Sequence, residues 1–375
     1  MTLVEFVPPT PHPLWKLCPQ MGITDVVVKV NPDLTGLPDP WQYETLAKIA
    51  GRLKDAGLNV VGLEGDPFDM SPIKEYGARV GENSSSWRKE EQNPLSNSNS
   101  KLQLVREEAL EHYCELLESM GKLGIKLLCY NFMVGKGWSR TGVREGRGGA
   151  KATYFSLRDG ENSSSSRKEE QIPFSNSNSK LQLNAEQVWS NYEFFIKAVM
   201  PTAERCGVRM ALHPDDPCLP SLGGYARIFG SVEAYDRAYA LYPSPSNAIT
   251  FCQANFKLML GNGELTTHNS QLTTLESAAR HFGKRIAFIH VRDVEGTKED
   301  FTELFHDQGD TDQFALMRTY RELGLDVPLR GDHVPEMAYD RELTPEGTPG
   351  YFTLGRLFAN GYLKALLKGT LAAAH

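Results

Sequence analysis

Residues 285–293 read RIAFIHVRD, a short apolar run that ends in polar residues. Short runs of this kind are typical of strands that are buried on both faces of a parallel sheet. Eight segments along the chain are predicted to be strands of one such sheet. They are Leu3–Val7, Thr24–Val30, Asn59–Gly65, Lys126–Phe132, Val208–Pro214, Ala248–Cys252, Arg285–Val291 and Asp326–Arg330.

Amphipathic helical patterns lie between these strands. Their apolar residues recur at intervals of three and four positions, which places them on one face of a helix. Glycine follows several of the patterns, as at Gly124 and Gly207, where it is the usual left-handed terminator of a helix. The predicted helices are Trp41–Ala56, Arg106–Leu123, Ala185–Cys206, Val232–Leu241, Leu275–Phe282, Gln313–Leu323 and Leu354–Leu367.

Eight strands that alternate with helices predict an α/β fold, a (β/α)8 barrel of the TIM type. We expect residues 1–375 to form a single barrel domain. A doubly wound sheet is the alternative, but such a sheet usually has about six strands and a GxGxxG turn. No such turn follows the first predicted strand.

Two nearly identical stretches interrupt this pattern. Residues 81–104 read GENSSSWRKEEQNPLSNSNSKLQL, and residues 160–183 read GENSSSSRKEEQIPFSNSNSKLQL. Both are rich in serine and asparagine and lack a helical or strand period, so we predict inserted low-complexity loops. Each follows a strand and precedes a helix, which places it on the face of a barrel that carries the active site. A lid or a partner-binding segment is the alternative to a passive insertion.

The composition argues against several classes of function. The 375 residues are 40% hydrophobic and 23% charged, and the formal net charge is −7. A negative chain is a poor general ligand for nucleic acids or anionic membranes. No apolar stretch approaches the ~18 residues of a spanning helix, and the N-terminus lacks the pattern of a signal peptide. The six cysteines are scattered without a CxxC pair, so we expect reduced thiols in a cytoplasmic protein with no nucleic-acid or membrane partner.

Four potential metal ligands end the last four predicted strands. They are His213, Cys252, His290 and Asp332, and successive members are roughly 40 residues apart, the length of one strand-helix unit. Parallel strands bring equivalent positions to the same rim, so these side chains can converge above the barrel mouth. Each residue alone is more often structural, but together they form a competent site for a divalent transition metal. The donor set suits Mn, Fe, Co or Zn, and it suits Ca or Mg alone poorly.

Several segments resemble the mannonate dehydratase family. The resemblance covers nearly the whole chain outside the two repeated stretches, and it implies a xylose-isomerase-like (β/α)8 barrel. It also implies the metal-dependent dehydration of D-mannonate to 2-keto-3-deoxy-D-gluconate and water in hexuronate catabolism. The implied metal is Mn²⁺, with Fe²⁺, Co²⁺ and Mg²⁺ as further candidates, and a homo-oligomer is expected. The segments are CYNFM (129–133), GVRMALHPDDP (207–217), ITFCQ (249–253), FIHVRD (288–293), FTELFHDQGDTD (301–312), RGDHVP (330–335) and PGYFTLGRL (349–357).

The resemblance also implies roles for individual residues. It makes the same four strand-end residues the metal ligands. It makes His333 and Tyr351 the acid/base pair, and it leaves open which of them is the acid. Asn131 and Arg140, which follow the fourth strand, and Arg292 are expected to contact the substrate.

The dehydration of a sugar acid needs this combination of groups. The C2 proton is only weakly acidic beside a carboxylate, and a bound metal spreads the negative charge that develops when it leaves. The C3 hydroxyl is a poor leaving group unless a proton or a metal accompanies it. Four protein ligands would saturate a tetrahedral Zn²⁺ but leave positions open on Mn²⁺, which favours Mn²⁺.

Other functions remain open at this point. A metal-dependent sugar or sugar-acid isomerase or epimerase could use the same barrel, but such enzymes typically hold two metals in a glutamate-rich rim. Glu64 is the one rim glutamate that the sequence places. The inserted stretches could also have left a catalytically inactive barrel that still binds metal.

Overall fold

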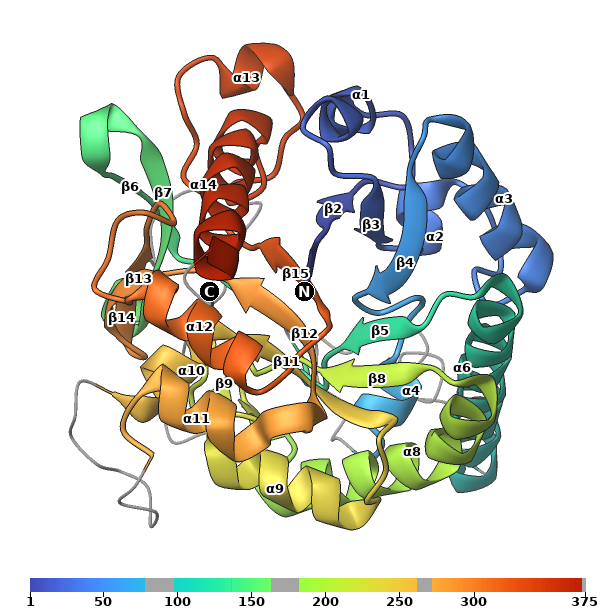
Figure 1. The fold of residues 1–375 in the computed structure, drawn as a ribbon. Coiled ribbons are helices and arrows are strands. Elements are labelled where there is room, and N and C mark those ends of the chain that lie inside the picture. The colour runs from blue at the N-terminus through green and yellow to red at the C-terminus, as the bar shows by residue number, and fades with distance from the viewer. Residues whose placement is uncertain (78–97, 136, 163–181, 262–271, 373–375) are drawn as a thin grey trace.

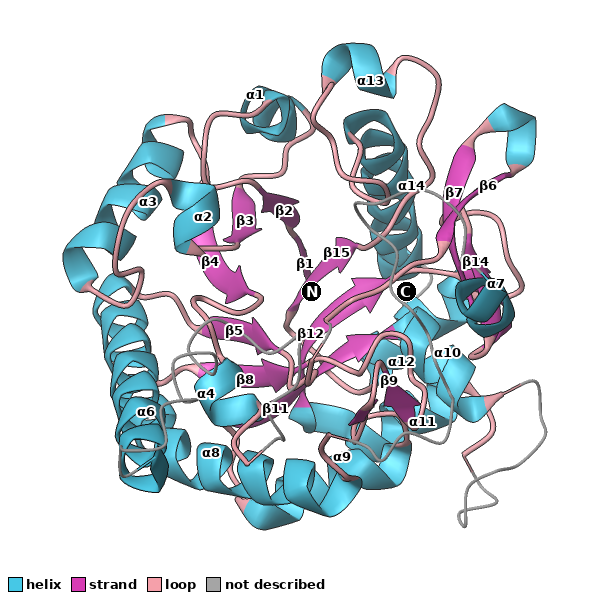
Figure 2. Cartoon of the chain, turned by 180° about the vertical axis from the view of Figure 1, so that it is seen from behind, coloured by secondary structure: helices cyan, strands magenta, loops and turns pink. Residues whose placement is uncertain are grey.

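The computed structural model describes residues 1–77, 98–135, 137–162, 182–261 and 272–372. Nine strands form one parallel sheet in the order β1-β15-β12-β11-β8-β5-β4-β3-β2. β1 (Thr2–Leu3) and β2 (Glu5–Val7) are two pieces of one strand, so the sheet closes on itself as an eight-stranded barrel. Helices surround the ring of strands (Figures 1 and 2), which confirms the predicted (β/α)8 fold.

All eight predicted strands are present, and most are one to three residues shorter than predicted. The first is interrupted at Val4, whose backbone N–H donates to the carbonyl of Leu329 at 2.8 Å. Figure 1 shows the N-terminal strand beside β15. The other barrel strands are β3 (Asp25–Val28), β4 (Asn59–Glu64), β5 (Leu127–Tyr130), β8 (Arg209–Leu212), β11 (Asn247–Cys252), β12 (Ile286–Val291) and β15 (Pro328–Gly331).

The seven predicted helices are also confirmed. The helix after the second repeated stretch begins with a capping box, in which Asn184 and Gln187 bond to each other's backbone N–H, and ends at left-handed Gly207. These helices are α3 (Tyr43–Asp55), α6 (Ser98–Leu123), α8 (Ala185–Cys206), α9 (Val232–Leu241), α11 (Leu275–Phe282), α12 (Gln313–Glu322) and α14 (Thr353–Ala372).

Several shorter helices were not predicted, because a helix of four to eight residues shows little periodicity. They lie in the connections between the major elements. They are α1 (Pro13–Gln20), α2 (Pro32–Thr35), α4 (Ser71–Lys74), α7 (Leu157–Asn162), α10 (Gln253–Leu260) and α13 (Asp340–Leu343), with 3-10 turns at Arg147–Gly149 and Gly283–Arg285.

The core has two layers. Alternate side chains of the barrel strands point inward, where mostly small residues such as Val27, Ala211 and Ala248 fill the interior. The outward side chains pack under the helices, where Phe195 lies edge-on to Tyr113 at 5.0 Å between ring centroids. The barrel is therefore a packed scaffold, and its chemistry is confined to the rim.

A small antiparallel sheet, not predicted from the sequence, joins two of the loops on the rim. β6 (Gly142–Glu145) and β7 (Lys151–Ser156) lie in the connection after β5, and β13 (Val294–Thr297) and β14 (Asp300–Glu303) follow β12. The order β13-β14-β7-β6 pairs β7 with β14. We call these four strands the accessory sheet; a separate two-stranded hairpin is formed by β9 (Ser221–Leu222) and β10 (Tyr225–Ala226).

The repeated stretches are only partly loops within the described residues. Helix α6 begins at Ser98, so the end of the first stretch is helical where we predicted a loop. The second stretch ends in Leu183, which is fully buried and forms a β-bridge with Tyr225. Leu104, at the equivalent position of the first stretch, is 65% exposed. Residues 78–97 and 163–181 lie outside the described residues.

Candidate metal centre

The four strand-end residues lie together at the barrel rim. One ligand atom from each of His213, Cys252, His290 and Asp332 lies within 4.8 Å of the others. The strands that carry them are neighbours in the sheet, and Cys252 is the direct register partner of His290. The predicted convergence is therefore what the topology produces.

The imidazoles of His213 and His290 have the protonation and the free lone pairs that a metal ligand needs. Nδ1 of His213 lies 2.8 Å from the carbonyl oxygen of Pro214, which accepts its proton and leaves the Nε2 lone pair free. Both ring nitrogens of the buried His290 lack a hydrogen-bond partner among the described residues. The nearest carboxylate oxygens, of Glu64 and Asp332, are 3.6 and 3.8 Å away and too distant to satisfy them. Burial lowers the pKa of both rings, to about 4 for His213, so both are neutral, as ligation requires.

The other two donors are charged or become charged on metal binding. Burial acts to raise the pKa of Asp332, but His333 and Arg330 beside it hold the pKa well below its usual value. Burial raises the pKa of the Cys252 thiol to about 12, and a bound divalent cation would displace its proton. The donor chemistry of the cluster thus suits a divalent transition metal.

A second group of possible ligands, Glu64, Cys129 and His290, is less suited to a cation. The guanidinium of Arg330 donates to both carboxylate oxygens of Glu64, at 2.6 and 3.1 Å. A second cation there would have to displace this buried positive charge. The geometry therefore argues against the two-metal centre expected for the alternative isomerase.

His333 and Tyr351 meet directly beside this cluster. The Tyr351 hydroxyl lies 2.9 Å from Nε2 of His333 and 3.4 Å from Oδ1 of Asp332. Burial and the charge of Asp332 raise the pKa of Tyr351 well above its usual value, so its phenol keeps its proton. The indole of Trp138 lies 4.9 Å from the imidazole of His333, between ring centroids.

A buried layer of charges lies behind His333. Arg140 donates to both oxygens of Asp216, at 2.6 and 3.0 Å, and Arg292 donates to Asp216 at 2.8 Å. Both arginines also donate to Glu303, from Arg140 Nε at 2.9 Å and Arg292 Nε at 2.7 Å. Despite full burial, the two guanidiniums lower the pKa of Glu303 to about 2 and that of Asp216 further below its usual range.

Glu303 and Asp216 were not assigned a role from the sequence, although both lie in segments that carry the family resemblance. Glu303 becomes part of the site because β14 pairs with β7, a pairing that the sequence pattern did not predict. The only signal for Glu303 in the sequence is that it is an acidic residue in a short alternating run after a buried strand. That signal is weak by itself, because most acidic residues in proteins are exposed.

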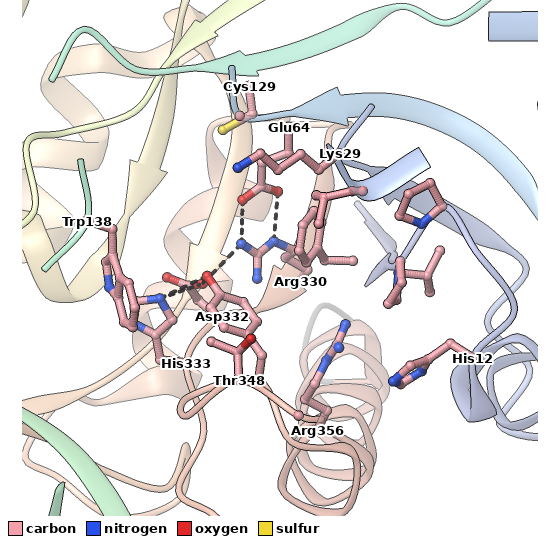
Figure 3. Close-up of a pocket in the computed structure, with 18 of the residues that line it drawn as sticks. His12, Lys29, Glu64, Cys129, Trp138, Arg330, Asp332, His333, Thr348 and Arg356 are labelled. Carbon is pink, nitrogen blue, oxygen red and sulfur yellow. Dashed lines mark hydrogen bonds and ion pairs between the residues drawn. The ribbon is translucent and has the colours of Figure 1, made fainter. Parts of the chain in front are cut away.

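A cavity of about 690 Å³ opens over the cluster and contains most of the predicted site. Figure 3 shows Trp138 and His333 at one end, Asp332 in the middle, and His12 and Arg356 at the other end. Phe6, Leu34 and several prolines contribute apolar wall. The cavity is large enough for a six-carbon sugar acid.

The three predicted substrate contacts are placed differently. Asn131 lines the cavity, and its Oδ1 accepts from Lys74 Nζ and from the Met133 N–H, both at 3.1 Å. Because Oδ1 faces these two donors, the NH2 group of Asn131 points the other way and can donate to a ligand in the cavity. Arg140 and Arg292 lie close by, but neither is among the residues that line the cavity, because both guanidiniums are held in the charged layer.

Comparisons with known proteins place the chain in one family. A family model described as D-mannonate dehydratase (UxuA) matches residues 60–374. The mannonate dehydratase of Streptococcus equi subsp. zooepidemicus is 31% identical over 294 residues, which cover 72% of this chain and 74% of the relative. That of Streptococcus pneumoniae is 31% identical over 286 residues, with the same coverage.

Solved structures agree in fold. The crystal structure of mannonate dehydratase from Streptococcus suis serotype 2 matches with a TM-score of 0.73 at 24% identity, over 100% of this chain and 94% of that chain. An L-ribulose 3-epimerase matches with a TM-score of 0.51 at 10% identity, over 100% of this chain and 97% of its own. In the part of the chain that the structure describes, no helix is long and apolar enough to cross a membrane.

Proposed function

The chain belongs to the D-mannonate dehydratase family of hydro-lyases, and we propose that it converts D-mannonate to 2-keto-3-deoxy-D-gluconate and water. The observation that carries the proposal is the convergence of four metal-type donors within 4.8 Å, three of which line the same cavity as His333 and Tyr351. A metal centre beside a proton-transferring pair is what the removal of a C2 proton and a C3 hydroxyl requires.

We propose that His213, Cys252, His290 and Asp332 hold one Mn²⁺, with Fe²⁺, Co²⁺ and Mg²⁺ as weaker alternatives. When bound, the cation supplies charge stabilisation for the carbanion-like C2 and leaves coordination positions open to the substrate. Hydrogen bonds from the surrounding protein orient these ligands, as Pro214 does for the ring of His213.

We assign the acid/base work to His333 and Tyr351, which share a contact of 2.9 Å. One of them takes the C2 proton, and the other donates a proton to the departing hydroxyl. Asn131, with its orientation fixed by Lys74, donates a hydrogen bond to the substrate. Arg140 and Arg292 support the substrate indirectly, through the charged layer behind His333.

The test is an assay of the purified protein loaded with Mn²⁺, in which 2-keto-3-deoxygluconate is measured with D-mannonate as substrate and D-gluconate as control. Formation of the keto-deoxy acid from D-mannonate supports the proposal. An isomeric aldonic acid or ketose as product would indicate the isomerase or epimerase. One metal per chain without any product would indicate an inactive homologue.

The predicted homo-oligomer and cytoplasmic location are part of the same proposal. The side chains of Leu343 and Phe358 are apolar and partly exposed, at 40% and 36%, and we propose that they lie in a subunit contact. Analytical ultracentrifugation of the metal-loaded protein would measure the assembly, and a purely monomeric species would contradict the oligomer.

A further inference from the structure

We propose that Glu303 is a positioning residue that sets the tautomer of His333, so that Nε2 of this histidine is the atom that exchanges protons in the reaction. The proposal rests on the dehydratase function proposed above. It adds a carboxylate from the accessory sheet to the acid/base pair and decides which member of the pair is the base.

The imidazole of His333 lies between a carboxylate and a phenol. Oε1 of Glu303 lies 3.0 Å from Nδ1 of His333, and the Tyr351 hydroxyl lies 2.9 Å from Nε2 on the other side of the ring. An ionised carboxylate can only accept, so the proton of the neutral ring resides on Nδ1. Nε2 then carries a lone pair, which accepts from the Tyr351 hydroxyl.

Arg140 is the other group near Nδ1, and it does not compete for this position. Its Nη2 lies 3.3 Å from Nδ1 of His333. The same nitrogen lies 2.5 Å from Glu303 Oε1 and 3.0 Å from Asp216 Oδ2. Nη2 has two hydrogens, and these two carboxylate oxygens accept both. The 3.3 Å contact is therefore proximity, and the Nδ1 proton is donated to Glu303.

Glu303 is held rigidly in this position. Oε1 accepts from Arg140, and Oε2 accepts from Arg292 Nε at 2.7 Å. The side chains of both arginines and of Glu303 are at most 4% exposed. Asp216 accepts from Nη1 and Nη2 of Arg140 and from Nη1 of Arg292, at 2.6 to 3.0 Å. The carboxylate thus cannot rotate away from His333 without breaking several charge-assisted hydrogen bonds.

The backbone that carries Glu303 is equally constrained. It is the last residue of β14, whose Phe301 pairs with Phe155 of β7 and stacks on its ring at 5.8 Å. A group that orients a catalytic side chain is more precise on a strand than on an irregular loop. The accessory sheet therefore fixes the position of the Glu303 carboxylate at the barrel rim.

The tautomer assigns the proton transfers. Nε2 of His333 takes the proton from C2, and the electron pair of that C–H bond forms the C2–C3 double bond. The C3–O bond breaks, and the departing hydroxyl takes the proton of Tyr351 and leaves as water. The His333 imidazolium, stabilised by Glu303, then returns its Nε2 proton to the Tyr351 phenolate, and the enol tautomerises to the keto acid.

A double-mutant cycle tests the proposal in the metal-loaded enzyme. Glu303→Gln should lower kcat by ~10²-fold or more, with KM and the metal content per chain within about twofold of native. In a His333→Asn background the same substitution should change kcat by less than about twofold, because Glu303 acts through His333. A similar loss in both backgrounds would mean that Glu303 is merely structural, and native kcat in Glu303→Gln would overturn the proposal.

Two further variants guard against misfolding. Asp300 lies on the same strand and forms a partly exposed ion pair with Arg144, at 2.9 Å. Asp300→Asn removes this ion pair and should leave kcat within about twofold of native. Glu303→Asp keeps the charge that the two arginines need and retracts the carboxylate by one methylene. This variant should fold, and its kcat should fall while its KM stays near native. Full activity of Glu303→Asp would contradict the need for a fixed contact between the carboxylate and His333.

A spectroscopic measurement separates this inference from the dehydratase function. ¹⁵N spectra of the metal-free full chain labelled at histidine, with His333→Asn to identify the His333 signals, report which ring nitrogen carries the proton. We expect the Nδ1–H form in the native chain and its loss in Glu303→Gln. An Nε2–H form in the native chain overturns the inference, whereas absence of product in the assay overturns only the function.

Discussion

The hydroxyl of Tyr351 lies 2.9 Å from Nε2 of His333. The same hydroxyl is 3.4 Å from Asp332, which belongs to the proposed metal centre. Tyr351 therefore lies between His333, its partner in the proposed acid/base pair, and the proposed metal centre. A proton can pass directly between the Tyr351 hydroxyl and Nε2 of His333.

Replacement of Tyr351 by phenylalanine should leave metal binding intact and lower kcat by ~10²-fold or more, because the phenol oxygen is lost and the ring stays. Steady-state turnover and metal content per chain are the measurements. Tyr362→Phe, on helix α14 and outside the cavity lining, is the matched control and should behave as native. Undiminished turnover of Tyr351→Phe would remove this residue from the mechanism.

Cys252→Ser should weaken metal binding by at least ~10-fold, because a serine hydroxyl is a far poorer ligand than a thiolate. Metal titration of the metal-free protein measures this affinity. Cys114, a free and half-buried cysteine on α6, provides the control, and Cys114→Ser should keep native affinity. A Cys252→Ser protein that retains full metal occupancy at native affinity would contradict the four-ligand centre.

Acid should destabilise the protein in part through Glu303. Its folded pKa is about 2, below the ~4.3 of an unfolded glutamate, so its contribution to stability is complete above pH ~5 and is lost as the pH falls towards 2. Between pH 5 and pH 3 this group alone should lower the free energy of unfolding by roughly 1.5 kcal/mol. Urea unfolding at several pH values should therefore show a flatter profile for Glu303→Gln than for native protein. Glu108→Gln, at an exposed position of α6, should keep the native profile, and equal slopes for all three proteins would refute the assignment.

Leu183→Ala should lower the free energy of unfolding by about 2 to 5 kcal/mol, because Leu183 is fully buried and the substitution leaves a cavity. Leu104→Ala, at the equivalent position of the other repeated stretch and 65% exposed, should change it by no more than about 0.5 kcal/mol. Denaturant unfolding of the two variants provides the comparison. Equal effects would mean that the two stretches end in equivalent environments.

This pair of leucines also shows where prediction from sequence ends. Both stretches close with the same KLQL motif, and local composition gave no reason to treat them differently. Leu183 is buried because β10 and the start of α8 meet there, a contact that depends on tertiary structure. The predicted extent of the second loop was therefore too long at its end.

The convergence of the four potential metal ligands could be predicted from the sequence, because it depends on a repeating pattern and not on a single tertiary contact. In a parallel barrel each strand repeats the same placement, so Cys252 and His290 had to reach the same rim once their strands were identified. Glu303 required knowledge of an antiparallel pairing between two distant loops, for which no periodic pattern exists. Asn131 came from the family resemblance, and its fixed orientation became visible only with Lys74 in place.

The closure of the barrel by β1 against β15 has a consequence for biosynthesis. Met1 and Asp326, which form an ion pair at this seam, are 325 positions apart. At a translation rate of ~5–20 residues per second, roughly 15 to 65 s pass between the emergence of the first strand and that of its partner. During this interval the nascent sheet has open edges, which are templates for unwanted pairing with other chains. The first strand is short and broken at Val4, and this brevity limits the length of edge exposed while the ribosome completes the chain.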